Sequence, residues 1–323
     1  MNTIGKLLLL FLLFAETLAG AQSLRAGPRI GLLIPGTLTE PEEKRDIDAF
    51  LQALREHGYR VGENLALEYR AADGKSGLLP TLAAELARLK VSVIVAVGTT
   101  AIEAAIKTTK SVPIVMISGG NPVGRGFVNS LMEPGGNVTG LSSVADGDEG
   151  KRLELLKDVF PWISRIFVVN ADSRTTRLEN YFYEAKGLGV KIEAINVVTL
   201  DDLKTNLEAS MSARADGLVT IRNLFTIRHA EEIIDFALKL RLPSIYESHE
   251  FVEKGGLMAY GVDYRASWRR APFYVDKILR GANPAFMPIE PPQFKFSINL
   301  RTANRMRYTI PPAVLLEAKE VIR

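Results

Sequence analysis

The feature that most constrains the fold is a pattern of secondary structure that occurs twice along the chain. Short apolar runs alternate with amphipathic segments of helical period, first over residues 29–117 and again over residues 165–259. Such runs are typical of buried strands, and a 3.6-residue period is typical of the helices that cover them. Strands alternating with helices form parallel sheets with helices on both faces. The sequence therefore predicts an α/β protein with two similar, doubly wound parallel-sheet lobes.

Both series follow the order strand, helix, strand, helix, strand, helix, strand. In the first series, the predicted elements are 29–35, 42–57, 65–70, 78–90, 91–97, a short helix from 101, and 113–117. In the second series, they are 165–169, 176–187, 190–197, 201–213, 216–221, 226–240 and 243–246, followed by a helix at 247–254 and a strand at 256–259.

The chain is expected to cross between the lobes several times. The Gly-rich stretch Glu133–Gly140 is the predicted first crossing, and residues 260–263 are the second. A helix at 268–280 would return to lobe 1, and the Pro-rich segment 283–292 would cross again so that 294–300 adds a strand to lobe 2. The predicted domains are lobe 1 at 29–140 plus 261–285, and lobe 2 at 141–260 plus 286–323. Several crossings between two lobes predict a multi-strand hinge and a clamshell.

The N-terminus has the pattern of a secretory signal peptide. Lys6 precedes the apolar run Leu7–Ala15, and Ala19, Gly20 and Ala21 form a small-residue cleavage signature. The alternative is an uncleaved membrane anchor, but the run is shorter than the roughly 20 apolar residues that a spanning helix needs. Residues 1–21 are therefore predicted to be removed on export to the periplasm.

The composition excludes several classes of site and partner. The chain has no cysteine, which rules out disulfides, thiolate catalysis and the lipid-bearing cysteine of a lipoprotein. Its net charge is +3, with basic and acidic residues interspersed. Because no basic run has interleaved aromatic residues, we expect no nucleic-acid partner. A monomer with no cofactor is expected.

Ligands of open parallel sheets bind outside the carboxyl ends of the strands. The residues just after the predicted strands are mostly hydroxyls and amides, which bind by hydrogen bonds and do little chemistry unaided. The candidate ligand-binding residues are Thr37, Thr99, Thr100, Ser118 and Asn121 in lobe 1, Asn170, Asp172, Arg222, Asn223 and Tyr246 in lobe 2, and Asp263 at the predicted hinge.

Each candidate has a structural alternative. Thr100 with Glu103 has the spacing of a helix capping box. Asn121 can simply form a turn before Pro122. Asp172 can cap a helix start, Arg222 can form an ion pair on its own lobe, and Tyr246 can be a core residue whose hydroxyl reaches water.

An enzyme is not expected, and no catalytic or metal-ligating residue is assigned. None of His57, His229 and His249 has metal-ligand spacing with another. The sequence has no G-x-S-x-G nucleophile elbow. The stretch Gly119–Arg125 approaches a P-loop but has Arg and Gly where Lys and Ser or Thr belong.

Three separated motifs resemble the ABC transporter substrate-binding proteins, a family that includes tryptophan- and phenylalanine-binding members. They are Pro134–Gly140, then Leu242–Tyr246 with Phe251–Gly261, and finally Gln293–Ala303 with Thr309–Pro312. The resemblance implies a type I periplasmic-binding fold and an amino-acid-like ligand at the 98–100 turn, Ser118, Asn170 and Asp263.

The chain departs from the family pattern at two positions. Members often have an Asp-Pro pair where Asn121 precedes Pro122, and many have a Pro-Asp turn where this chain has Arg222 and Asn223. Both changes replace an acid, so an anionic ligand is a reasonable hypothesis.

The expected function is capture of a small organic ligand, a carboxylate of amino-acid-like or aromatic type, between the two lobes. Closure would precede delivery to an ABC permease in the inner membrane, and binding energy must favour the closed state for the ligand to shift the population. The alternative is a periplasmic sensor that signals to a membrane receptor. An exported α/β enzyme is the third possibility.

Overall fold

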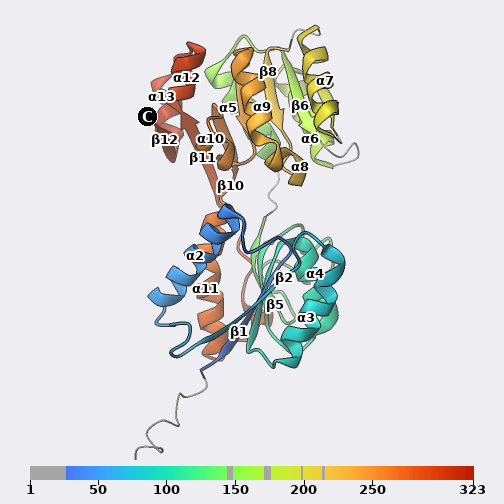
Figure 1. Ribbon diagram of the computed structural model, residues 1–323, viewed down its shortest axis with the longest axis vertical. Coiled ribbons are helices and arrows are strands. Elements are labelled where there is room, and N and C mark those ends of the chain that lie inside the picture. The colour runs from blue at the N-terminus through green and yellow to red at the C-terminus, as the bar shows by residue number, and fades with distance from the viewer. Residues whose placement is uncertain (1–26, 144–147, 171–175, 198, 213–214) are drawn as a thin grey trace, which may run out of the picture. The chain divides into compact units, whose positions relative to one another are not determined.

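The computed structural model describes residues 27–143, 148–170, 176–197, 199–212 and 215–323. The chain divides into two compact units (Figure 1). Unit 1 contains the chain up to Val144 together with Tyr264–Pro292, and unit 2 contains Ala145–Asp263 together with Gln293–Arg323. The predicted signal segment 1–21 lies outside the described residues. Within the described ranges, no helix combines the length and the apolar character needed to cross a membrane.

Unit 1 is built on a parallel sheet whose strand order is β2-β1-β3-β4-β5. The strands are β1 (Arg29–Ile34), β2 (Ala66–Ala71), β3 (Val93–Val97), β4 (Ile114–Gly119) and β5 (Val138–Ser142). The helices are α2 (Pro41–Glu56), α3 (Leu79–Arg88), α4 (Gly98–Thr108) and α11 (Tyr264–Leu279), with 3-10 turns η1 (Ser76–Leu78) and η2 (Pro284–Phe286).

The two faces of this sheet bury separate cores because successive strand side chains point to opposite sides. Ile30, Leu32 and Ile34 pack with α2 and α11, whereas Leu33 lies with α3 and α4 on the other face. The sheet is therefore covered on both sides, as the alternating pattern predicted.

Unit 2 is built on a larger sheet of order β12-β11-β10-β9-β8-β6-β7. Its strands are β6 (Arg165–Asn170), β7 (Lys191–Asn196), β8 (Gly217–Thr220), β9 (Ser244–Tyr246), β10 (Met258–Val262), β11 (Phe294–Asn299) and β12 (Glu320–Ile322). β10 and β11 pair antiparallel, and the other pairs are parallel.

Helices also cover both faces of the second sheet. Residues of α5 (Asp148–Val159), α6 (Thr176–Gly187), α12 (Leu300–Met306) and α13 (Pro312–Glu317) bury one core. Residues of α7 (Leu200–Ser212), α9 (Ala230–Lys239) and α10 (His249–Glu253) bury the other, and α8 (Leu224–Arg228) precedes α9.

The stretch predicted as the first crossing contains a strand instead. Val138–Ser142 is β5, which pairs with β4, and the chain passes to unit 2 after Val144. Gly140 makes this pairing possible because a Cβ at that position would lie 2.3 Å from the Met116 carbonyl oxygen. The sequence pattern did not predict strand β5, because its apolar run is short and contains Thr, Gly and Ser.

Residues 286–292, assigned to lobe 2 from the sequence, pack on unit 1. Thr139 donates its hydroxyl to the Met287 carbonyl at 2.7 Å, and the Ser142 N–H donates to Glu290 O at 2.9 Å. These bonds extend the edge of β5, so the change to unit 2 occurs at Gln293.

Candidate functional site

The carboxyl ends of β3 and β4 lie side by side in unit 1. Val97 and Ile117 are register partners, so Gly98, which begins α4, and Ser118, near the end of β4, each follow one of these partners at this edge. The Gly120 N–H donates to the Thr99 hydroxyl at 3.1 Å and ties the two loops to each other. Two predicted site residues, Thr99 and Ser118, are thus brought to one edge of the sheet.

Ser118 has an unusual backbone conformation and an unusual hydroxyl environment at this edge. Its backbone is left-handed, with a φ of 60°. Its carbonyl accepts a hydrogen bond from the Ser143 hydroxyl at 3.2 Å, yet its own hydroxyl is buried and has no hydrogen-bond partner among the described residues. Buried polar groups are normally paired, and strained backbone concentrates at ligand sites. The hydroxyl is therefore a candidate to bond a ligand.

The N-terminus of α4 begins beside Ser118. Val97 occupies the N-cap position, so no side chain caps the first turn. The positive end of the helix dipole and its free N–H groups favour an anion. Thr100 does not form the capping box that its spacing to Glu103 allows: it lies exposed inside the helix, and Glu103 instead accepts from Lys107 Nζ at 2.6 Å.

Thr37 and Asn121 complete the predicted set in unit 1. The hydroxyls of Thr37 and Thr39 lie 3.1 Å apart in the loop after β1. Asn121 is exposed, has a φ of 44°, and its side-chain oxygen accepts from the Gly124 N–H at 3.0 Å. The Asn121 oxygen is therefore engaged by its own turn.

The predicted residues of unit 2 have mixed roles. Asn170 is fully buried at the end of β6, and Asp172 lies outside the described residues. Asn223 caps α8 by accepting from the Thr226 N–H at 2.9 Å. Tyr246 is a core residue stacked on Phe251 at a ring distance of 4.5 Å, and burial raises the pKa of its hydroxyl. Of these residues, Asn170 stays the stronger ligand candidate.

A buried ionic cluster lies at the carboxyl edge of the second sheet. Its centre is Arg152, whose side chain is completely buried on α5. Arg152 Nη1 donates to Asp148 Oδ2 at 2.9 Å and to the Tyr260 carbonyl at 3.0 Å, and Nε donates to the Tyr181 hydroxyl. Its Nη2 lies 3.2 Å from Glu247 Oε1. A single guanidinium thus joins α5, α6, β10 and the loop after β9.

Arg177 closes the same cluster from the first turn of α6. It reaches Asp148 Oδ2 at 2.7 Å, Glu149 Oε1 at 2.8 Å and Glu247 Oε1 at 2.8 Å. The second oxygen of Glu247 accepts from the Arg222 backbone N–H. The cluster therefore fixes the loop that follows β8, where Arg222 and Asn223 were predicted to meet a ligand.

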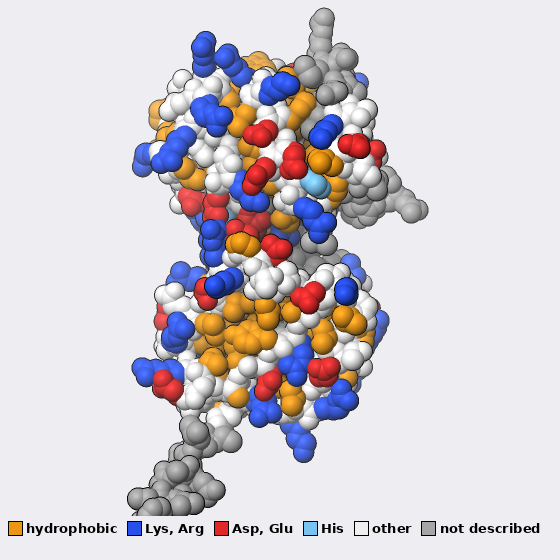
Figure 2. Space-filling view, in the orientation of Figure 1, with side chains coloured by type: hydrophobic (Ala, Val, Ile, Leu, Met, Phe, Trp, Pro, Cys, Tyr) orange, Lys and Arg blue, Asp and Glu red, His pale blue; other side chains and the backbone are white. Residues whose placement is uncertain are grey.

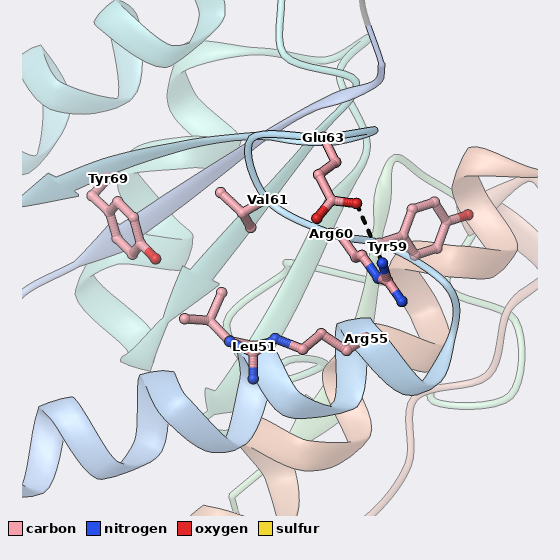
Figure 3. Close-up of a pocket in the computed structure, with 7 residues that line it drawn as sticks. All are labelled: Leu51, Arg55, Tyr59, Arg60, Val61, Glu63 and Tyr69. Carbon is pink, nitrogen blue, oxygen red and sulfur yellow. Dashed lines mark hydrogen bonds and ion pairs between the residues drawn. The ribbon is translucent and has the colours of Figure 1, made fainter.

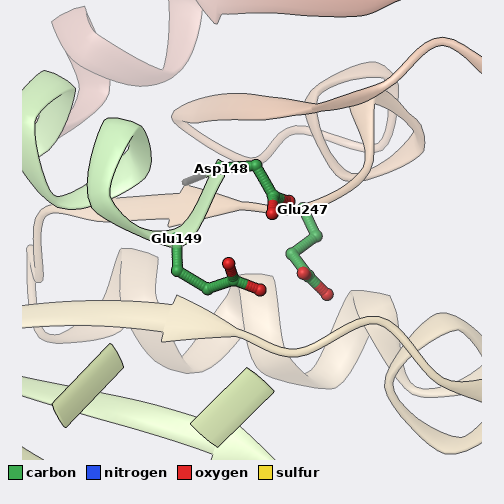
Figure 4. Close-up of side chains that lie close together, drawn as sticks. All are labelled: Asp148, Glu149 and Glu247. Carbon is green, nitrogen blue, oxygen red and sulfur yellow. The ribbon is translucent and has the colours of Figure 1, made fainter. Parts of the chain in front are cut away.

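The three carboxylates of this cluster, Asp148, Glu149 and Glu247, lie close together (Figure 4), with one oxygen of each within 4.8 Å of the others. They fit a guanidinium cluster better than a metal centre, because Arg152 and Arg177 already bond to them. These two cations outweigh burial and lower the pKa of Asp148, whereas burial raises the pKa of Glu149.

Asp263 lies where β10 ends, and its N–H donates to the Gln293 carbonyl at 2.7 Å. Two residues earlier, Gly261 passes close to Glu247: a Cβ on Gly261 would lie 1.6 Å from the Glu247 carbonyl oxygen. Only glycine permits this approach, which packs β10 against the loop carrying Glu247.

Sequence reasoning missed Asp148, Glu149, Arg152 and Arg177. A local signal was present, since Asp148 and Glu149 precede Arg152 by four and three residues, the spacing at which helix side chains meet. Such spacing is also common on solvated helix faces. Only the structure shows that Arg152 is buried.

Comparison with known proteins agrees with the geometry. Residues 37–322 match the family described as ABC transporter substrate binding protein. The chain belongs to this family. It is also 26% identical to a tyrosine-binding protein of Clostridioides difficile (strain R20291) over 246 residues, which cover 74% of this chain and 70% of that protein. The resemblance seen in the three sequence motifs is thereby confirmed.

Solved structures confirm the predicted fold class. A conserved domain protein from Vibrio cholerae has a TM-score of 0.78 and 25% identity, covering 91% of this chain and 99% of its own. An ABC domain from Streptococcus pneumonia, solved in complex with L-Trp, has a TM-score of 0.78 and 23% identity, covering 92% and 100% of the two chains. The family is one of substrate-binding proteins, which agrees with the binding chemistry of the site residues.

Proposed function

We propose that this protein is the solute-binding component of an ABC importer and captures an amino acid. The observation that carries the proposal is the buried hydroxyl of Ser118, which has no hydrogen-bond partner in the described part of the chain and lies beside the uncapped N-terminus of α4. Together they form a hydrogen-bond donor and a positive dipole end, which suit a ligand carboxylate.

The relatives favour an aromatic amino acid over other carboxylates. One is a tyrosine-binding protein, and a structural neighbour was solved with L-Trp. The sequence-based hypothesis of a purely anionic ligand has less support, because the ligands named for these two proteins, tyrosine and L-Trp, are zwitterions. We therefore favour a zwitterion.

In this proposal, each unit contributes the carboxyl edge of its own sheet. Thr99 and Ser118 would bond the carboxylate, and Asn170, Arg222 and Asp263 would contact the rest of the ligand. The proposed partner is an ABC permease in the inner membrane, the proposed compartment is the periplasm, and the proposed state is a monomer.

The test is a calorimetric and thermal-shift comparison of L-Tyr, L-Trp and L-Phe with their carboxamides and their deaminated acids. A ligand that binds only the native state stabilises it by about 2.7 kcal/mol at 100 times Kd. We expect at least one amino acid to raise the Tm and its carboxamide to bind much more weakly. The assignment would be refuted if none of the three amino acids raised the Tm or gave a binding signal in calorimetry.

Two further measurements separate the alternatives. Mass spectrometry of the recovered ligand would expose an enzyme, because a binding protein returns it unchanged. Deletion of the gene should abolish uptake of the radiolabelled amino acid at low concentration. Unchanged uptake with altered transcription would identify a sensor instead.

A further inference from the structure

A cavity of about 430 Å³ lies on the flank of unit 1, between the C-terminal half of α2, the loop at 59–63 and the edge strand β2 (Figure 3). It is lined by Leu51, Arg55, Tyr59, Arg60, Val61, Glu63 and Tyr69. Hydrophobic side chains also gather on the face of unit 1 seen in Figure 2. The volume is within the roughly 300–1,000 Å³ of small-molecule sites.

The walls of this cavity combine apolar and charged side chains, and part of them is fixed. Leu51, Tyr59 and Tyr69 pack against the core that α2 and α11 share. The Tyr59 hydroxyl is held by Asp276 at 3.0 Å, which fixes its ring. Val61 leaves 47% of its surface exposed. A ligand with an apolar or aromatic body would bury these surfaces.

Two hydrogen-bond donors in the cavity have no partner within the described ranges. Arg60 pairs with Glu63 at 3.4 Å, so their charges offset each other. Among the described residues, the Arg55 guanidinium makes no ion pair or hydrogen bond, and neither does the Tyr69 hydroxyl. Figure 3 shows the Arg55 side chain extending along α2 toward Leu51. Arg55 is exposed, and burial together with the Asp48 carboxylate raises the pKa of Tyr69, so the charge of this cavity that attracts an anion is that of Arg55.

We propose that this cavity is a second small-molecule site, for a monoanion that joins a carboxylate to an aromatic or apolar body. The carboxylate would bond Arg55, and the body would lie on Leu51 and Val61. The loop at 59–63 precedes β2 and so lies at the amino ends of the strands, away from Ser118 at a carboxyl end. The site is therefore independent of the proposed ligand edge.

The experiment is an NMR titration of the full protein with phenylacetate, read from the methyl groups of Leu51 and Val61. Phenylacetamide supplies the same ring without charge, and acetate supplies the charge without the ring. The Ile117 methyl, next to Ser118, reports separately on the proposed ligand edge. We expect saturable shifts at Leu51 and Val61 with phenylacetate, and weaker binding of both analogues.

Arg55→Gln should weaken the binding of phenylacetate by about two- to fivefold, as expected for a partly exposed charge pair. It should leave the binding of phenylacetamide unaffected. The matched control is Arg88→Gln, because Arg88 is an exposed arginine in the last turn of α3. The proposal fails if Leu51 and Val61 show no saturable shift, if acid and amide bind equally, or if the two variants behave alike.

Discussion

Arg152 Nη2 lies 3.2 Å from Glu247 Oε1, joining the middle of α5 to the loop after β9 through two side chains that are buried. The same carboxylate binds the Arg222 N–H with its other oxygen. A charge pair at the protein core thus sets the backbone of a predicted ligand loop. A buried ion pair costs desolvation, and removal of one partner leaves the other charge stranded.

Arg152→Met is therefore expected to destabilise unit 2 by about 3–5 kcal/mol, because three carboxylates lose their buried cation. The matched control is Arg165→Met, which removes a half-exposed arginine paired with Glu193 at 3.4 Å and should cost less than about 1 kcal/mol. Urea denaturation in a Trp268→Phe background checks this, because Trp162 then reports on unit 2 alone. Equal losses for both variants would contradict a central role for Arg152.

Ser118→Gly separates ligand binding from stability. Glycine adopts the φ of 60° without strain, so the free energy of unfolding should stay level or rise by up to about 1 kcal/mol. Ligand affinity should fall by roughly tenfold if the hydroxyl bonds a carboxylate. Calorimetry with the amino acid found in the screen measures the affinity, and unchanged affinity would remove Ser118 from the site.

Thr99 and Thr100 are adjacent and allow a matched comparison. Thr99→Val deletes the acceptor of the Gly120 N–H, so it should cost about 1 kcal/mol and weaken ligand binding through movement of the β4 loop. Thr100→Val alters an exposed residue and should change stability by less than about 0.5 kcal/mol. Thermal melts and calorimetry test both variants. A smaller effect of Thr99→Val than of Thr100→Val would refute the role of Thr99 in joining the two loops.

His249 should make the stability of unit 2 depend on pH. Burial lowers its pKa, assisted by Lys295, while Glu250, Glu253 and Asp263 act in the opposite direction. The native state therefore favours the neutral ring, and the unfolded chain, with a pKa of about 6.5, binds more protons.

The stability contributed by His249 is present above pH ~6.5 and is lost as the pH falls toward the folded pKa, with a slope of at most about 1.4 kcal/mol per pH unit. His249→Gln removes that slope. Melting temperatures measured from pH 5 to pH 8 provide the check. Parallel curves for the wild type and the variant would show that His249 does not titrate on unfolding.

The element types followed from local pattern. The helix expected at 176–187 is α6 (Thr176–Gly187), and the continuous apolar run ending at Val97 is β3. These agree because the period of apolar residues is a property of neighbouring positions. The break of the helix expected at 226–240 into α8 and α9 at His229 was not predicted, since no Gly or Pro marks it.

The carboxyl-end rule selected Thr99 and Ser118 as candidates, but it did not show which of the selected side chains already have partners. The Thr99 hydroxyl accepts from the Gly120 N–H, Asn223 caps a helix, and Tyr246 is a core residue. The partner of Asn223 is local, since Thr226 lies three residues along the chain at the spacing of a capping box. Glu247, which binds the Arg222 N–H, is instead brought to this loop only by folding.

The sequence by itself determined the alternation of strands and helices, the two-unit α/β class and the family, because these depend on periodicity and on motifs along the chain. Only the tertiary structure decided that β5 belongs to unit 1 and that Arg152 is buried among three carboxylates. Both depend on close contact between segments far apart in the sequence, where Gly140 meets Met116 and Arg152 meets Glu247. Strand pairing and charge burial are properties of surfaces that exist only after the chain has packed.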